Sequence, residues 1–131
     1  AALRAMLQRA LPLTVLQYRR DRLLVEGVRH FLRSPDNLGA TAERVADHLH
    51  VSVRTLHRQL REEGSSLQQI KDDARRDRAI ALLDRSRKSV KQISALVGFA
   101  NEKSFTRAFR GWTGLPPQAW RERSHTSGPA P

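Results

Sequence analysis

The sequence predicts an all-α fold in which two similar helical units are joined by a long helix. Three observations lead to this prediction. Apolar residues recur at the three- and four-residue spacing of amphipathic helices along most of the chain. Only 5% of the residues are aromatic, and no stretch alternates convincingly between apolar and polar residues, as a half-buried strand would. Two separate segments of the chain also resemble each other, which indicates a repeated helical unit.

The first residues of the chain are expected to stand apart from the domain. Residues 1–20 are apolar and basic, and Pro12 interrupts their helical spacing. The sequence starts with alanine rather than methionine and has no signal-peptide pattern. We therefore interpret residues 1–20 as a linker or as the end of a neighbouring N-terminal domain, and we expect the helical domain to occupy residues 21–123.

The first unit is expected over about residues 41–64, after an introductory helix whose apolar stripe lies within residues 23–32. Thr41 and Ser52 are favoured N-cap residues, so each is expected to begin a helix. Gly64 follows the second of these helices and is expected to end it.

The linking helix is expected over about residues 66–84, and the second unit over about residues 89–114. Ser66 and Ser89 each stand three residues before a glutamine, which is the capping-box pattern at the start of a helix. On the linking helix, three arginines are interleaved with aspartates, which is typical of a solvated, self-paired surface rather than a docking site. These arginines are Arg75, Arg76 and Arg78.

The end of the chain is expected to hold one more short helix and then a tail. Gly114 is expected to end the second unit, and the two prolines at residues 116–117 can begin a helix that contains Trp120. Residues 124–131 have the composition of a disordered tail.

The two units match each other over most of their length. Residues 45–51 match residues 93–99, and residues 56–61 match residues 105–110, with one extra residue in the turn region of the second unit. Each copy is interpreted as a short helix, a tight turn and a second helix, which is the helix-turn-helix plan. Gly98 gives the turn a residue that tolerates positive φ, and His50 stands at the same place in the first copy.

The second helix of each copy has an apolar face and a polar, mostly basic face. The apolar faces consist of Leu56 and Leu60 in the first copy and of Phe105 and Phe109 in the second. The polar faces consist of Arg54, His57, Arg58 and Arg61 in the first copy and of Glu102, Lys103, Thr106, Arg107 and Arg110 in the second. A helix held to a core in this way fits the major groove of DNA, although an ordinary solvated helix has a similar composition.

The charge of the chain favours a polyanionic partner. The sequence has 24 lysines and arginines against 13 aspartates and glutamates, for a net charge of +11. Nucleic acid is the first candidate, and an anionic membrane surface bound by the basic, amphipathic residues 1–33 is the second. Core packing and a linker explain residues 1–33 more simply, and two basic helix-turn-helix copies favour DNA.

The composition argues against an enzyme and against a bound metal or cofactor. The chain has no cysteine, which excludes disulfides, thiolate zinc sites and a cysteine nucleophile. His48 and His50 have no partner at metal-ligand spacing, and no glycine-rich phosphate loop is present. No apolar run is long enough to span a membrane.

The second unit resembles the AraC/XylS family of bacterial transcription regulators. The resemblance rests on ISALVGF at residues 93–99, FTRAFR at residues 105–110, WTGLPP at residues 112–117 and the pair that Trp120 forms with the following arginine. It extends over about residues 20–123. Trp120 stands where family members more often have tyrosine, and the first copy has a histidine where glycine or asparagine is common.

The resemblance implies about seven helices and two recognition helices that enter successive major grooves, held about 34 Å apart by the linking helix. It places base contacts at Arg54, His57 and Arg58 in the first unit and at Glu102, Lys103, Ser104, Thr106 and Arg107 in the second. Arg58 and Arg107 are the expected guanine readers, with phosphate contact as the alternative. The candidates for phosphate contact are Ser52, Arg61, Ser89 and Arg110.

Several of these positions have a second interpretation. Glu102 can accept a hydrogen bond from cytosine N4, or it repels phosphate or pairs with Lys103. His57 can donate to a base edge or pack on the DNA backbone. Ser104 and Thr106 are small, so they can permit close approach of the helix to DNA.

The sequence thus predicts a sequence-specific DNA-binding transcription regulator, in particular an activator, and not an enzyme. The alternative is an architectural protein that binds all DNA sequences alike. The resemblance also implies that double-stranded promoter DNA and RNA polymerase are partners and that no membrane is involved. It further implies an effector ligand on a missing N-terminal effector or dimerisation domain, and a cytoplasmic, nucleoid-associated location in a bacterium. A fragment with two such units can bind DNA as a monomer.

Overall fold

The computed structural model describes residues 24–126, and in this part of the chain every regular element is helical. A first helix at residues 24–32 is followed by a single 3-10 turn, η1 (Pro35–Asn37), and by six further α-helices. These are α3 (Ala42–His48), α4 (Val53–Glu62), α5 (Leu67–Arg85), α6 (Val90–Leu96), α7 (Glu102–Thr113) and α8 (Pro117–Thr126). The expected all-α fold with about seven helices is therefore confirmed.

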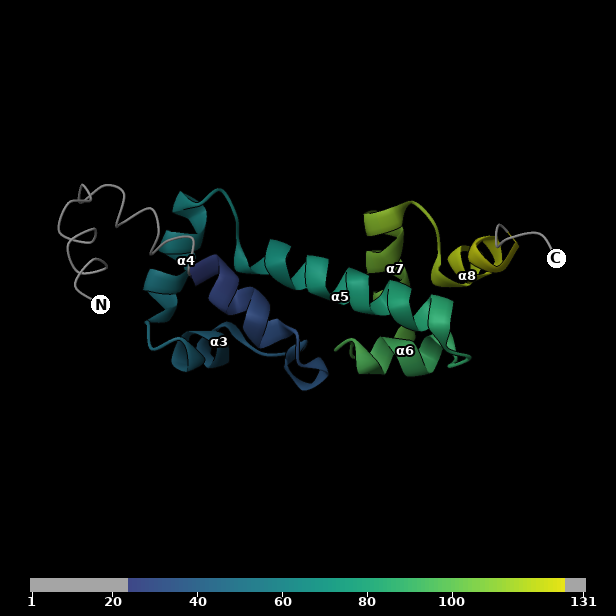
Figure 1. Ribbon diagram of the computed structural model, residues 1–131, viewed down its shortest axis with the longest axis horizontal. Coiled ribbons are helices and arrows are strands. Elements are labelled where there is room, and N and C mark those ends of the chain that lie inside the picture. The colour runs from purple at the N-terminus through teal and green to yellow at the C-terminus, as the bar shows by residue number, and fades with distance from the viewer. Residues whose placement is uncertain (1–23, 127–131) are drawn as a thin grey trace, which may run out of the picture.

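The molecule is elongated because α5 forms an axis between two separate helical units (Figure 1). The first helix, α3 and α4 gather at one end of α5, while α6, α7 and α8 gather at the other. α4 and α7 both stand across the direction of α5, one at each end. The expected arrangement of two helix-turn-helix units, α3–α4 and α6–α7, joined by a long helix is confirmed.

Polar side chains begin each of the helices from α3 to α7. The N-cap residues Thr41, Ser52, Ser66, Ser89 and Asn101 each accept a hydrogen bond from the backbone N–H three residues further on. These bonds satisfy N–H groups that the first turn of a helix leaves without an intrahelical partner. Local sequence chemistry therefore sets where the elements start.

One of the two expected capping boxes is complete and the other is not. At α6, the Ser89 hydroxyl accepts from the Gln92 N–H, and the Gln92 side chain accepts from the Ser89 N–H. At α5, the Ser66 hydroxyl accepts from the Gln69 N–H, but the Gln69 side chain donates to Asp73 instead. The expectation of a reciprocal box at Ser66 was wrong because an aspartate one turn along the helix competes for the amide.

The turn within each unit uses a left-handed residue at the same place. His50 has φ 59°, and Gly98 has φ 88°, as the repeat predicts. The left-handed region carries a steric cost for any residue with a Cβ, and histidine is among the side chains that tolerate it best. Both units therefore make the same tight turn, and the first unit makes it with a small local strain.

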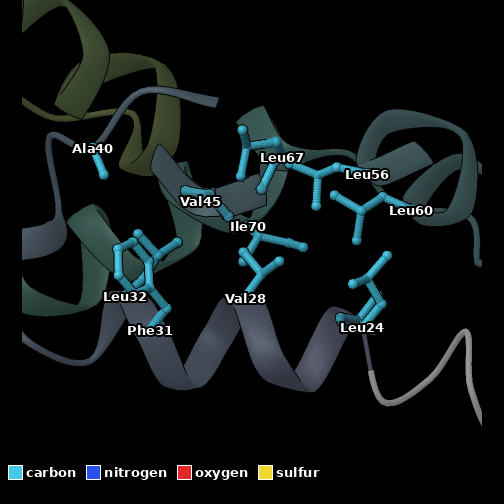
Figure 2. Packing of buried hydrophobic residues seen from close by; sticks show 12 residues of the cluster. Leu24, Val28, Phe31, Leu32, Ala40, Val45, Leu56, Leu60, Leu67 and Ile70 are labelled. Carbon is cyan, nitrogen blue, oxygen red and sulfur yellow. The ribbon is translucent and has the colours of Figure 1, made fainter. Parts of the chain in front are cut away.

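The core of the first unit is mostly aliphatic, with one aromatic residue, Phe31, and it is shared among all of the helices of that unit. Val28 from the first helix faces Leu56 and Leu60 from α4, and Ile70 from α5 closes the cluster (Figure 2). Leu56 and Leu60 are fully buried. Because these two residues lie one turn apart on α4, their burial fixes which side of α4 faces solvent.

The core of the second unit combines aliphatic residues with a group of packed aromatic rings. Phe105 and Phe109 of α7 are fully buried and lie with their ring centroids 5.7 Å apart. Phe109 also contacts Trp120 of α8 edge-on, with ring centroids 5.8 Å apart, which is a favoured aromatic geometry. Trp120 thus helps to fill the core from α8.

The last helix is longer than the sequence predicts. α8 continues to Thr126, so the expected start of a disordered tail at residue 124 was wrong. Long-range polar contacts hold this end of α8 to α5: the Ser124 hydroxyl lies 2.8 Å from the Asp84 carboxylate, and Arg121 Nε donates to the Leu83 carbonyl. Such pairings are not visible in local composition.

The expected linker at residues 1–20 and the rest of the expected tail lie outside the described residues.

The charged surface of α5 is only partly the self-paired face that the sequence predicts. Arg76 forms salt bridges with Asp73 and Asp77, in agreement with that prediction. Arg75 is half-buried and points inward, where Nε donates to the carbonyl oxygen of Leu38. The interpretation of Arg75 as a solvated residue was wrong because it meets a loop that lies far away in sequence.

We predict that Leu60→Ala lowers the free energy of unfolding by about 2–5 kcal/mol, because it opens a cavity in the first core. Leu96→Ala is the matched control: Leu96 is 44% exposed on α6, and its truncation should cost less than about 0.5 kcal/mol. Urea unfolding followed by far-ultraviolet circular dichroism measures both. Equal losses for the two variants would contradict the assignment of the core.

Candidate nucleic-acid interface

The outer face of α4 is basic from end to end. The buried pair Leu56 and Leu60 holds the opposite face against the core. The side chains that are exposed on the outer face are Arg54, His57, Arg58 and Arg61, all of them predicted from the sequence. Arg54, Arg58 and Arg61 follow one another at four- and three-residue intervals, so they form a single row along the helix.

The outer face of α7 repeats this row in the same register. Lys103, Arg107 and Arg110 occupy the positions of Arg54, Arg58 and Arg61 in the repeat, and all three are exposed. Glu102 and Ser104 are exposed beside the row, and Thr106 is partly exposed. The structure therefore places every predicted base-contact position on the solvent side of one of the two recognition helices.

The surface of α7 has two shallow hollows that share Lys103 and Arg107. One hollow is lined by Glu102, Lys103, Thr106, Arg107 and Arg110, and the other by Asn101, Lys103, Ser104, Arg107 and Ala108. Both are lined by α7 and its N-cap residue alone. They are spaces between side chains along an exposed ridge, which suit an extended partner rather than an enclosed small molecule.

The cations of these two faces have no carboxylate partner within residues 24–126. The salt bridges found in that part of the chain join Arg29 to Glu26 and Arg76 to Asp73 and Asp77, on the first helix and on α5. Glu102 and Lys103 are neighbours, yet no salt bridge joins them. The outer faces of α4 and α7 thus present positive charge that is free to meet an external anion.

The candidates for phosphate contact fall into two structural classes. Arg61 and Arg110 are exposed at the last turn of α4 and α7. Ser52 and Ser89 are exposed N-cap residues of α4 and α6, where their hydroxyls accept from Thr55 N–H and Gln92 N–H. Their capping role is confirmed, and the positive end of each helix dipole lies beside them.

The sequence reasoning missed Asn101 as a candidate for the interface. Its side chain accepts from the Ser104 N–H at 2.8 Å and begins α7, as Ser52 begins α4. It also lines the hollow that contains Lys103 and Arg107. The repeat contains the signal that would have found it, because the extra residue of the second unit precedes Asn101 and brings it into register with Ser52.

Two helix-turn-helix units in one chain, each with a buried apolar pair and an exposed basic row, define a bipartite helix-turn-helix domain. The family comparison gives the same result, since a family model described as a helix-turn-helix domain matches residues 45–123. The chain belongs to this family. Together with the similarities reported in the next two paragraphs, this match confirms the expected membership of the AraC/XylS family.

Relatives of known name are bacterial regulators rather than enzymes. The chain is 37% identical over 102 residues to the HTH-type transcriptional regulator VqsM of Pseudomonas aeruginosa, which covers 78% of this chain and 31% of that protein. It is 36% identical over 99 residues to the ornithine utilization regulator of the same organism, covering 76% of this chain and 29% of the relative. The chain thus spans about a third of the length of these relatives.

Solved structures share the fold over most of the chain. A DNA-binding transcriptional dual regulator from Escherichia coli K-12 superposes with a TM-score of 0.72 at 28% identity, covering 79% of this chain and 93% of that one. The DNA-binding domain of AdpA, solved in complex with a target DNA, gives a TM-score of 0.71 at 28% identity and covers 82% and 97% of the two chains. Within residues 24–126, no helix has the length and apolar character needed to cross a membrane.

We predict that Asn101→Ala lowers the free energy of unfolding by about 1 kcal/mol, because the Ser104 N–H loses its acceptor. Asn101→Asp keeps an acceptor at the same place and favours the helix dipole, so its stability should match that of the parent. Urea unfolding of the two variants measures this difference. If Asn101→Asp lost as much stability as Asn101→Ala, the capping role would be contradicted.

Proposed function

We propose that this domain is the DNA-binding part of a transcription regulator, and that α4 and α7 read two successive major grooves of one duplex. One observation carries the proposal. Three exposed cations stand at equivalent positions on both helices, and an apolar pair buried on the opposite side holds each helix in place. An α-helix fits the major groove, and a rigid row of cations along it matches the phosphates and guanine edges found there.

Arg58 and Arg107 are the residues that we assign to base reading. They occupy the same repeat position, at the middle of each basic row. A guanidinium group can donate two parallel hydrogen bonds to O6 and N7 of guanine, which lysine cannot do with the same geometry. His57 and Thr106 stand at the preceding repeat position, and Arg54 and Lys103 lie one turn before the two arginines. These four residues, together with Glu102 and Ser104, are the further base-contact candidates.

Phosphate contact is assigned to the ends of the helices. Arg61 and Arg110 stand one turn after the base-reading arginines, where a helix leaves the groove. Ser52, Ser89 and the newly found Asn101 lie at helix starts, where backbone N–H groups and the helix dipole favour an anion. These contacts fix orientation on the duplex without selecting sequence.

Glu102 distinguishes the second unit from the first. The equivalent position in the first unit is Val53, so only α7 carries a carboxylate at its first position. Glu102 is exposed and forms no salt bridge with Lys103, which leaves it able to accept from an external donor. We assign it to the N4 amino group of cytosine, and the competing role is repulsion of a nearby phosphate.

Further partners follow from the family rather than from this domain. We propose that the full-length regulator acts in the bacterial cytoplasm, activates transcription by contact with RNA polymerase, and senses an effector through a separate N-terminal domain. The domain itself can bind as a monomer because it carries both recognition helices in one chain. An architectural protein that binds all DNA alike is the alternative, and the charge alone would support it equally well.

Selection from a randomised duplex pool at near-physiological salt, followed by sequencing, tests the function directly. We expect a bipartite motif whose halves lie about one helical turn apart. Tight binding without any motif would overturn sequence-specific reading and favour the architectural alternative.

We predict that Arg58→Ala and Arg107→Ala each weaken binding to the selected duplex by about 1–3 kcal/mol and relax sequence preference within one half of the motif. Fluorescence anisotropy on the selected duplex and on random duplex measures both effects. Arg87→Ala is the control. It removes the same charge from a residue that is exposed between α5 and α6, away from both recognition helices. Equal losses on selected and random duplexes would show that Arg58 and Arg107 contact only phosphate.

We predict that Glu102→Gln relaxes the preference for a single C·G base pair in the second half of the motif. The amide retains the shape of the side chain but presents one acceptor and one donor group in place of two acceptors. A repeat of the selection with the variant measures this. A uniform rise in affinity for every duplex, with the motif unchanged, would instead show that Glu102 repels phosphate.

A further inference from the structure

The loop at residues 38–40 joins the two units, and its last residue, Ala40, is buried in the first core. Leu38 is 2% exposed, and it lies in the second core, among residues such as Leu83 and Ile93, rather than in the first. In Figure 1 this loop, drawn in blue, reaches the green turn that follows α6. We call residues 38–40 the tongue. It gives the two units a contact in addition to α5.

Two side chains of α5 hold the tongue by its backbone. Lys71 Nζ donates to the carbonyl oxygen of Ala40 at 2.8 Å, and Arg75 Nε donates to the carbonyl oxygen of Leu38 at 3.0 Å. Both cations are partly buried, and burial lowers the pKa of each. A cation taken from water needs compensation, and a carbonyl oxygen supplies it. These two hydrogen bonds therefore hold the tongue in place against α5.

The turn of the second helix-turn-helix unit lies directly against the tongue. A Cβ added to Gly98 would stand 3.0 Å from the nitrogen of Gly39 and 3.1 Å from its Cα. The Arg75 guanidinium lies over the ring of Phe99, 4.9 Å from its centroid. Arg75, on the helix between the units, therefore contacts the tongue through the Leu38 carbonyl and the turn of the second unit through Phe99.

We infer that the tongue, held by Lys71 and Arg75 and packed against Gly98, sets the relative placement of the two recognition helices, together with the contact of Arg75 with Phe99. We call these residues together the clamp. In the proposed function, which this inference extends, they are positioning residues that determine which spacing of half-sites the domain accepts.

The physical reason is that a single helix is only a semi-rigid spacer. α5 has 19 residues, which at 1.5 Å per residue makes it about 28 Å long. Near its middle, Ala74 is the residue that packs against both cores. A helix held at its two ends can bend and twist there, whereas a second connection beside it resists both motions.

Spacing discrimination follows from that rigidity. One base pair added between two half-sites moves them apart by about 3.4 Å and rotates them by roughly 35° around the duplex axis. A rigid pair of recognition helices cannot follow such a change, while a loosely joined pair can. The clamp would therefore favour one spacing and raise affinity for it by holding both helices in the bound geometry before they meet DNA.

The first test is independent of DNA. The chain has no cysteine, so Glu62→Cys on α4 and Gly111→Cys on α7 give a specific pair of sites for nitroxide labels. Glu62 is exposed, and a Cβ at Gly111 meets nothing within 4 Å. Pulsed electron–electron double resonance between the two labels then gives the distribution of distances between the two recognition helices.

We predict that Arg75→Leu broadens this distribution at least about twofold, because the variant removes both the hydrogen bond from α5 to the Leu38 carbonyl and the contact of Arg75 with the Phe99 ring. Arg76→Leu is the matched control: it removes the same charge from the next residue, which forms its salt bridges with aspartates on α5, and it should leave the width unchanged.

A second pair of variants is Gly98→Ala and its control, Gly114→Ala. Both glycines are left-handed, with φ 88° and 83°, but a Cβ meets the tongue only at Gly98. Only Gly98→Ala should broaden the distribution.

Widths for Arg75→Leu and Gly98→Ala that equal those of their controls would overturn the inference. Circular dichroism of each variant confirms that it is folded, and a variant that unfolds is replaced by Lys71→Met, which breaks the contact with Ala40 alone.

The second test uses the selected duplex with one or two base pairs inserted between its half-sites. We expect Arg75→Leu to reduce the affinity ratio between native and altered spacings by about threefold or more, with unchanged binding to a single half-site. A merely destabilised protein would lose affinity for all duplexes by the same factor, and that result would contradict the clamp. If the parent itself showed no spacing preference, the proposed function would fail, while the label distances would still decide whether the clamp exists.

Discussion

The burial of two apolar side chains one turn apart on α4 and on α7 is the constraint on which the rest of the structure depends. Leu56 and Leu60 in one unit, and Phe105 and Phe109 in the other, are fully buried. A helix with such a pair has one rotational setting about its axis, so its opposite face must meet solvent. The buried pairs, which do not face solvent themselves, therefore determine the direction in which the exposed cations point. The two buried pairs differ in chemistry, since the pair on α4 is aliphatic and the pair on α7 is aromatic, yet both impose the same rotational setting on the basic row.

A second constraint acts between the units. Each helix-turn-helix unit can fold around its own core, but two units read one duplex together only if their separation and rotation match the DNA. α5 sets the approximate separation, while the tongue and the two cations that hold it join the units at a second point. Gly98 then has two roles, because its left-handed backbone makes the tight turn and its missing side chain leaves room for the tongue.

Much of this architecture could be predicted from the sequence because it is governed by local chemistry. The N-caps Thr41, Ser52, Ser66 and Ser89, the left-handed turn at His50 and Gly98, and the exposed face of both recognition helices all follow from residues within a few positions of one another. The misses are long-range. Arg75 meets a carbonyl 37 residues away, and Ser124 meets a carboxylate 40 residues away. No local pattern reports such contacts. Asn101 is a different case, since closer alignment of the two repeats places it opposite Ser52.

Methylation interference on the selected duplex tests the central claim most directly, because methyl groups on guanine N7 block contacts in the major groove. If α4 and α7 occupy successive major grooves, interfering guanines should form two clusters about one helical turn apart on the same face of the duplex. A single cluster would show that only one of the two helices reads the groove. Undiminished binding with guanines methylated throughout would show that the basic rows bind the phosphate backbone, and it would contradict the account.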